Sequence, residues 1–293
     1  MDKSTIYKLQ NFVSIALTFG ETGAVDRVNE HLKFDIAGAT NDCIQWIKDW
    51  IETNCPGHKV VIGLSGGKDS TIMAALLARA LGAENVIGVG MPGNNQGLNE
   101  AEEIAAHLGI KFYQFSLGQL ETDYAKNFSQ DLNLEMSAQT KMNIPPRLRM
   151  TTLYAIAQSV NGVVVNTCNL SEDYIGYSTL FGDCAGSFAP LRQFTATEII
   201  AIGDYLGLPE KWVHKVPDDG LPGSSPDEEK FGFTYKVLDK YVRFGRLGLA
   251  EKPGVLEKIE KRHYSNLFKL DIVRIPSFAE DVEIIEKYYN FEK

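Results

Sequence analysis

Short apolar runs and longer amphipathic segments alternate along the chain. The apolar runs have the length of buried strands and occupy residues 60–62, 85–90, 110–115 and 162–166. Apolar residues recur at helical spacing near Ser4 and over residues 41–53, 101–108, 117–128, 195–206, 235–243 and 253–264. This alternation predicts parallel β-α-β units, and therefore an α/β fold with a doubly wound parallel sheet flanked by helices.

Two prolines mark the start of a helix that is expected to end near Val160. Pro145 and Pro146 fit the first turn of a helix, where a missing N–H costs little, and Asn143 stands where an N-cap is expected. Residues 131–142 are polar and are expected to be irregular. Two further stretches are rich in turn-forming residues and predict loops at residues 176–186 and 216–226.

The first apolar run leads into a loop with the features of a phosphate site. Residues 60–70 have the sequence VVIGLSGGKDS, with glycines at 63, 66 and 67. Glycines let the backbone approach an anion closely, and the helix that opens at Ser70 would direct its first amides at that anion. The loop is not a Walker A motif, because its glycines lie one residue too close together and an aspartate follows the lysine.

Composition narrows the class of protein. Hydrophobic residues make up 44% and charged residues 23%, values that are ordinary for a soluble globular chain. The net charge of −9, from 29 basic and 38 acidic residues, argues against broad binding to nucleic acid or to anionic membranes. No apolar run has membrane-spanning length and no signal-peptide pattern follows Met1, so a soluble protein without a membrane partner is expected.

The cysteines indicate a reducing compartment. Cys43, Cys55, Cys168 and Cys184 form no CxxC pair and no metal-ligand spacing, so free thiols and a cytoplasmic location are expected. No internal repeat or clean linker divides the chain. We therefore expect one domain over residues 1–293, with a helical N-terminal segment to about residue 54 and a helical C-terminal segment from about residue 234.

The loop SGGKDS resembles the pyrophosphatase loop SGGxDS of the N-type ATP pyrophosphatases, which split ATP into AMP and pyrophosphate. That resemblance leaves the acceptor open, and later segments narrow it. They resemble, in the same order, motifs of the ammonia-dependent NAD synthetases: NIPPRLRM at 143–150, NTCNLSE at 166–172, GYSTLFGD at 176–183 and an acidic-to-tyrosine stretch at 227–235. The resemblance spans about residues 26–276 and implies a Rossmann-like fold of the adenine nucleotide alpha hydrolase type.

The resemblance implies a two-step reaction that uses ATP and Mg²⁺. The nicotinate carboxylate of deamido-NAD attacks the α-phosphorus of ATP, which releases pyrophosphate and leaves an adenylate. Ammonia then displaces AMP and gives NAD. Because the two substrates supply the nucleophiles, no catalytic protein nucleophile is expected, and catalysis depends on positioning and charge neutralisation.

The matched motifs also imply roles for individual residues. ATP is expected to contact Gly63, Leu64, Ser65, Gly66, Gly67, Lys68, Asp69, Ser70 and Thr167. Deamido-NAD is expected to contact Asn143, Arg149, Asp183 and Lys269. Asp69 and Glu172 match the carboxylates that hold magnesium, a role that suits hard oxygen ligands. Arg147 and Arg149 do not share a helix face, so at most one of them is expected to point into the site.

Structural interpretations stay open for three of these segments. Asn143 is, by itself, equally well explained as a helix cap, and Glu172 with Asp173 as a solvated acidic pair. Cys168 is expected to be a buried, inert thiol, because no step of the reaction needs a catalytic one.

The chain departs from the family pattern at five positions. Residues that the pattern fills with lysine, an acid, lysine, threonine and histidine are here Leu180, Ser187, Ala196, Asp218 and Phe268. The lysine that Ala196 replaces is usually assigned to the ATP phosphates, so a favourable charge is missing there. Candidates to supply that charge are Lys68, Lys215 and Arg192.

Alternative functions remain open at this stage. A different amidating or thiolating ATP pyrophosphatase, such as a tRNA-modifying enzyme, is opposed by the net charge of −9 and the lack of a CxxC pair. A degenerate ATP-binding module is opposed by Asp69 and Glu172 but favoured by Leu180 and Ala196. A glutamine-dependent synthetase needs a glutaminase domain, for which the residues before the loop are too few, so free or partner-supplied ammonia is expected.

The resemblance finally implies an oligomeric state and a mobile loop. It implies a homodimer with the dinucleotide site at the interface, partly lined by the helix that contains Trp46 and Trp50. Small-molecule substrates are the expected ligands, with no nucleic-acid partner. Residues 216–226 are expected to form a lid that closes over ATP.

Overall fold

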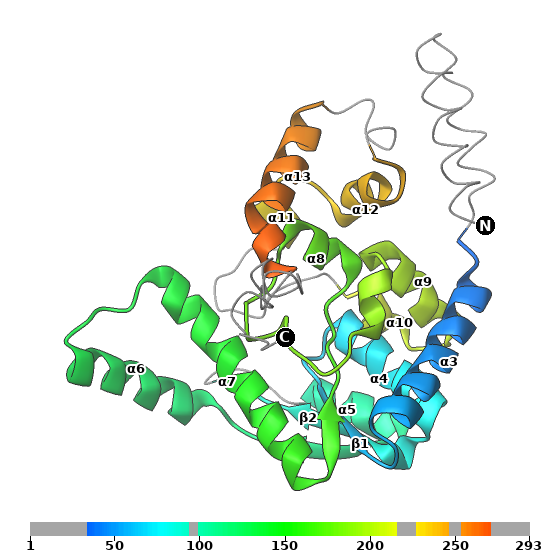
Figure 1. Ribbon diagram of the computed structural model, residues 1–293, viewed down its shortest axis with the longest axis horizontal. Coiled ribbons are helices and arrows are strands. Elements are labelled where there is room, and N and C mark those ends of the chain that lie inside the picture. Colours follow the sequence, from blue (N-terminus) through cyan, green and yellow to red (C-terminus); the bar gives the residue numbers. More distant parts are fainter. Residues whose placement is uncertain (1–33, 94–98, 216–226, 246–252, 271–293) are drawn as a thin grey trace, which may run out of the picture.

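The computed structural model describes residues 34–93, 99–215, 227–245 and 253–270 of the chain (Figure 1). Within these ranges the strands form a four-stranded parallel sheet in the order β3-β2-β1-β4. The strands are β1 (Lys59–Gly63), β2 (Val86–Gly90), β3 (Lys111–Gln114) and β4 (Gly162–Val164). The chain moves outward from β1 to β3 and then crosses back to β4 on the other side of β1. The predicted doubly wound parallel sheet is confirmed.

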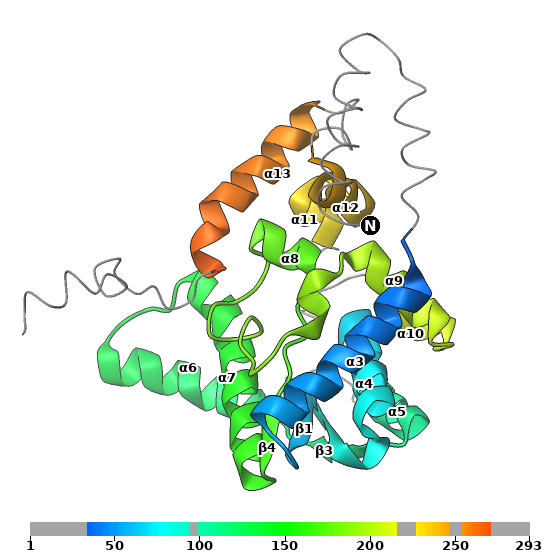
Figure 2. The same cartoon turned by 45° about the vertical axis from the view of Figure 1, so that its right-hand side comes forward.

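Helices cover both faces of this sheet (Figure 2). On one face α4 packs against β1 and β2, with α3, α5 and α9 beside it. On the other face α7 packs against β1 and β4, and α6 packs against α7. Their bounds are α3 (Ile36–Asn54), α4 (Lys68–Leu81), α5 (Asn99–Leu108), α6 (Gly118–Leu132), α7 (Ala138–Ser159) and α9 (Ala196–Tyr205).

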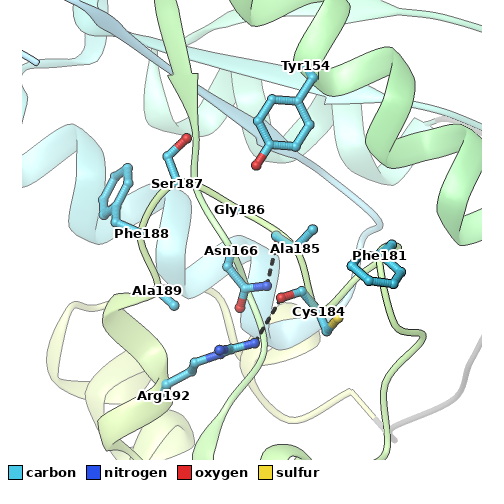
Figure 3. A pocket seen from close by; sticks show the side chains of 10 residues that line it. All are labelled: Tyr154, Asn166, Phe181, Cys184, Ala185, Gly186, Ser187, Phe188, Ala189 and Arg192. Carbon is cyan, nitrogen blue, oxygen red and sulfur yellow. Dashed lines mark hydrogen bonds between the residues drawn. The ribbon is translucent and has the colours of Figure 1, made fainter. Parts of the chain in front are cut away.

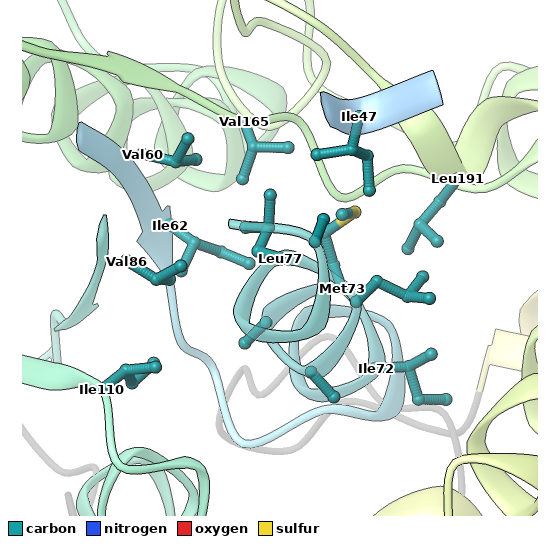
Figure 4. Packing of buried hydrophobic residues seen from close by; sticks show 14 of the residues in the cluster. Ile47, Val60, Ile62, Ile72, Met73, Leu77, Val86, Ile110, Val165 and Leu191 are labelled. Atoms are coloured by element: carbon teal, nitrogen blue, oxygen red, sulfur yellow. The ribbon is translucent and has the colours of Figure 1, made fainter. Parts of the chain in front are cut away.

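Alternating residues of the central strand build two apolar layers. Val60 and Ile62 point into a cluster with residues of α3, α4 and α5 (Figure 4). Val61 points the other way and packs with Met150 and Leu153 of α7. Because a strand sends successive side chains to opposite faces, this apolar run buries both faces of β1. The burial fixes the carboxyl end of β1, where the glycine-rich loop begins.

Four helices that follow β4 form a third apolar cluster above the carboxyl edge of the sheet (Figure 1). They are α8 (Leu170–Ile175), α11 (Asp227–Phe231), α12 (Tyr235–Phe244) and α13 (Pro253–Asn266). The cluster brings Ala196 at the start of α9 together with Tyr235 of α12. The remaining short elements are η1 (Ala83–Asn85), η2 (Pro190–Gln193), α10 (Glu210–Val213) and η4 (Leu267–Lys269).

The start of α7 differs from the sequence expectation. The helix begins at Ala138, and Ser137 is its N-cap, accepting a hydrogen bond from Thr140 N at 3.1 Å. Asn143 therefore lies inside the helix, and the predicted N-cap is wrong. The predicted irregular segment is confirmed only for residues 133–137, because α6 extends to Leu132 and α7 begins at Ala138. Pro145 and Pro146 are tolerated inside α7 because the carbonyls that lose their bonds belong to Lys141 and Met142, which are exposed to water.

Some expectations lie outside the described residues. They are the helix near Ser4, the lid at 216–226 with Asp218, and the chain beyond residue 270. In the described part of the chain, no helix has both the length and the apolar character needed to cross a membrane. All four cysteines are free thiols, as expected.

Candidate active site

The glycine-rich loop joins β1 to α4 at the carboxyl edge of the sheet. Hydroxyl groups of the loop hold its backbone: Ser65 Oγ accepts from Gly67 N at 3.2 Å, and Ser70 Oγ donates to Gly67 O at 3.1 Å. Gly66 has a φ of +79°, and a Cβ there would lie 2.8 Å from Glu100 Oε2, so glycine is required. No side chain caps α4. Its first amides are therefore left for an anion.

The paired carboxylates of Asp69 and Glu172 lie beside this loop. Asn169 connects them: its side-chain amide donates to Asp69 Oδ1 at 3.1 Å, and its side-chain oxygen accepts from Glu172 N at 3.0 Å. Glu172 Oε2 in turn accepts from Asn169 N at 3.1 Å, which completes a capping box at the start of α8. The capping box holds Glu172 half-buried, where the charge of Asp69 acts on it, so the solvated interpretation of Glu172 is wrong.

The two carboxylates repel each other in a poorly solvated site. Burial raises the pKa of Glu172 well above its usual range, and the negative charge of Asp69 raises it further. An excess of negative charge in this setting suits a divalent cation. Within the described ranges no three His, Cys, Asp or Glu side chains gather around one point that fits a metal. Two carboxylates leave coordination positions for phosphate oxygens and water, which is how Mg²⁺ is usually held.

Lys68 neutralises part of this charge. Its ammonium group lies 2.6 Å from Asp69 Oδ2, and only 4% of its side chain is exposed. Burial alone would lower the pKa of Lys68, but the charges of Asp69 and Glu172 outweigh burial and raise it. The free protein thus holds its own cation at the carboxylates that would bind a metal.

The four residues predicted for deamido-NAD surround the loop at residues 176–183. Asp183 Oδ1 accepts from Thr179 N at 2.8 Å, and Thr179 Oγ1 lies 3.3 Å from Asn143 Oδ1. Lys269 donates to the carbonyls of Gly176 and Ser178 at 2.7 and 2.8 Å.

Desolvation affects the charged groups in this region. Burial raises the pKa of Asp183, although the residue keeps accessible surface. Burial lowers the pKa of Arg149, whose Nε donates to Met91 O at 3.3 Å and which feels the charge of Asp183. The structure therefore brings Asn143, Arg149, Asp183 and Lys269 around one loop, and the charge of Asp183 also acts on Glu172.

A cavity of about 320 Å³ opens next to this loop (Figure 3). Asn166 forms its floor and donates to the carbonyls of Asp183 and Ala185 at 2.8 and 2.9 Å. Arg192 donates to Cys184 O at 2.9 Å, and its Nε lies 2.8 Å from Asp173 Oδ2. These contacts fix the backbone of residues 183–185 between β4 and η2. Aromatic walls come from Tyr154, Phe181 and Phe188.

Comparisons with known proteins identify the family. The sequence model of NAD synthase matches residues 39–272 of the chain. The chain belongs to the NAD synthase family. The curated NH(3)-dependent NAD(+) synthetase of Methanococcus aeolicus is 39% identical over 197 residues, or 65% of this chain and 75% of that protein. That of Carboxydothermus hydrogenoformans is 35% identical over 226 residues, or 76% of this chain and 91% of that protein.

Solved structures of similar proteins agree with this assignment. The NMN synthetase from Francisella tularensis superposes with a TM-score of 0.74 at 29% identity, over 83% of this chain and 99% of that one. The NH3-dependent NAD synthetase from Campylobacter jejuni superposes with a TM-score of 0.69 at 26% identity, over 83% and 100% of the two chains. The recognised family and the fold type are thus confirmed.

Four departures from the NAD synthase pattern now have positions, and two of them are wholly or partly buried. The carbonyl of Leu180 accepts a hydrogen bond from Arg147 Nε at 3.1 Å, so Arg147 supports the loop. Arg149 instead faces Met91 and Asp183. Ala196 is buried at the start of α9, and its amide donates to Ser171 Oγ at 3.0 Å.

The other two departures lie at the surface. Ser187 is exposed at the cavity wall, and Phe268 is exposed beside Lys269. Thr167 is half-buried in the segment that joins β4 to α8.

Cys168 has the environment of an inert thiol. It is buried, its Sγ donates to Asp183 O at 3.2 Å, and burial raises the pKa of the thiol well above its usual range. A thiol that keeps its proton is a poor nucleophile. We expect Cys168→Ala to keep most of the wild-type turnover in a steady-state assay. Complete loss of activity with an unchanged melting temperature would instead mean that the thiol takes part in the chemistry.

Proposed function

We propose that the chain is a ligase that forms a C–N bond, converting deamido-NAD to NAD with ammonia and ATP. Family membership supports the reaction class. The observation that carries the proposal is the pairing of Asp69 with Glu172 directly beside an uncapped, glycine-rich helix start. Such a site can receive a triphosphate and its metal together.

The residues of the chain would position the substrates and neutralise their charge, and none of them would act as a nucleophile. The start of α4 would take the phosphates that leave as pyrophosphate, which accumulate negative charge as the α-phosphorus bond breaks. Asp69 and Glu172 would hold Mg²⁺, which neutralises phosphate charge when it is bound. The loop at residues 176–183 would orient the nicotinate carboxylate toward the α-phosphorus, and later present the activated carbonyl to ammonia.

We also propose a homodimer in the cytoplasm. Large apolar side chains are exposed on α6, on α7 and in the segment between them: Leu120, Tyr124, Leu132, Leu134 and Met142. A second copy of the chain would bury such a surface. The helix α3 offers less, because Trp50 stacks on Phe188 at 4.4 Å between ring centroids and leaves mainly Trp46 exposed. Free thiols support a reducing compartment.

The test is product analysis with purified protein. We expect NAD, AMP and pyrophosphate in equal amounts from deamido-NAD, ATP and ammonium, with Mg²⁺ required and glutamine a poor nitrogen donor. Nicotinate mononucleotide is the matched alternative acceptor, because one similar structure is that of an NMN synthetase. Turnover of that substrate alone would refute deamido-NAD as the acceptor. Formation of ADP and phosphate would refute the whole reaction class.

A further inference from the structure

Lys68 occupies an unfavourable position for a lysine. It is the first residue of α4, where the helix dipole repels a positive charge, and its side chain is 4% exposed. Burying a lysine also costs free energy unless the charge is paired. Neither the helix dipole nor the burial of the side chain therefore favours a cation here.

Several groups hold the Lys68 ammonium in place. Asp69 Oδ2 lies 2.6 Å away, and the ring centroid of Tyr235 lies 5.6 Å away in a cation–π arrangement. The negative charges of Glu172 and Asp227 also act on it. The ammonium thus sits within the carboxylate cluster next to the anion loop, and does not extend into solvent.

The other two candidate cations are engaged elsewhere. Lys215 donates to Gly66 O at 3.2 Å and pairs with Glu100, and its side chain is 41% exposed. Arg192 is held by Asp173 and by the carbonyl of Cys184 at the cavity. Of the three, Lys68 is the cation that contacts a predicted magnesium ligand.

Ala196, which stands where the family pattern has a lysine, lies close to Lys68. Ala196 belongs to the apolar cluster that contains Tyr235, and the Lys68 ammonium lies over the ring of Tyr235. A lysine at 196 and a lysine at 68 would therefore reach toward one region from two different helices. In this chain the cation of this region comes from α4.

We propose that Lys68 is a movable counter-ion. It pairs with the carboxylates when no ligand is bound and with the phosphates of ATP when Mg²⁺ and ATP are bound. In the free protein its ammonium neutralises Asp69. When Mg²⁺ takes that carboxylate, the ammonium turns to the phosphates of ATP and supplies the charge that Ala196 cannot. This inference rests on the proposed function, since it assumes that ATP and Mg²⁺ bind at this loop.

The two roles predict opposite effects of removing the charge. Mg²⁺ competes with the Lys68 ammonium for Asp69, so Lys68→Met should bind Mg²⁺ about tenfold more tightly without ATP. The same change removes a cation from the phosphates, so the affinity for ATP should fall about tenfold. A lysine with a merely structural role would not move the two affinities in opposite directions.

Titration calorimetry of the full chain tests this split. Mg²⁺ is titrated without nucleotide, and a non-hydrolysable ATP analogue is titrated with Mg²⁺ present, for the wild type and for Lys68→Met. Lys211→Met, which removes an exposed lysine paired with Glu103, is the matched control and should change neither affinity. Restoration of analogue binding in Lys68→Met/Ala196→Lys would locate both lysines at the same phosphates.

Each outcome decides the inference. Unchanged Mg²⁺ binding in Lys68→Met, including no detectable binding in either protein, overturns it, and so does weaker binding of both ligands. If the double variant does not fold, the calorimetric split in Lys68→Met decides alone. Absence of NAD synthesis by the wild type would refute the proposed function, yet these binding measurements need no turnover and would still test Lys68.

Discussion

Asp69→Ala is expected to lower kcat for NAD formation by at least about a hundredfold. Asp69 contacts both Lys68 and Asn169, so its carboxylate joins the start of α4 to the start of α8. Alanine would remove one of the two oxygen ligands available to Mg²⁺ and would leave the Lys68 ammonium without its closest partner. The loss should appear in kcat more than in the KM for deamido-NAD, because the acceptor residues surround a different loop.

A matched control separates this effect from a general loss of surface charge. Asp204 is an exposed carboxylate of α9 that pairs with His214 Nε2 at 2.9 Å. Asp204→Ala should leave kcat within about twofold of the wild type, since exposed pairs contribute little. Single-turnover release of pyrophosphate with both variants measures the first chemical step. A rate for Asp69→Ala within threefold of the control would show that the metal site is elsewhere.

The sheet could be predicted from the sequence because its strands are buried on both faces. Such strands are continuous apolar runs, so residues 60–62 and 162–166 stand out from the amphipathic helices around them. The start of α7 could not be predicted in the same way. Pro145 and Pro146 favoured a helix start, whereas Ser137 with Thr140 three residues later was the weaker but correct signal.

The candidate site was predicted in part for a similar reason. Asp69 follows the glycines of the loop at a fixed spacing, so its position at the start of α4 depends on local sequence alone. The partnership of Asp69 with Asn169 joins residues that are 100 positions apart, and it depends on the packing of α8 against α9, α12 and α13. A local signal did exist, because Asn169 and Glu172 have the spacing of a capping box.

The burial of Lys68 could not be foreseen at all. Lysines are almost always exposed, and the side chain is covered by residues of α8, α11 and α12 that follow it by more than a hundred positions. The same limit applies to Arg192, whose contacts with Asp173 and Cys184 depend on the path of the loop after β4. Charges that are placed by tertiary packing have no periodic pattern in the sequence.

Glu172→Gln is expected to lower kcat by at least about a hundredfold. The same change is expected to stabilise the metal-free protein. The raised pKa of Glu172 means that the folded chain holds this proton more tightly than the unfolded chain does. As the pH rises from the ordinary pKa of glutamate to the raised value, the wild type therefore loses stability. Glutamine is neutral at every pH and can still accept the capping hydrogen bond from Asn169 N, so it avoids this loss.

Melting temperatures across a pH series measure the effect. Below the ordinary pKa of glutamate the two proteins should melt together, and above it Glu172→Gln should melt progressively higher, until the pH passes the raised pKa. Each 1 kcal/mol gained would raise the melting temperature by about 2–4 °C. Mg²⁺ with ATP should narrow the gap by stabilising only the wild type. A gap that does not depend on pH would contradict the charge-repulsion argument, because removal of a purely structural carboxylate has no reason to follow its titration.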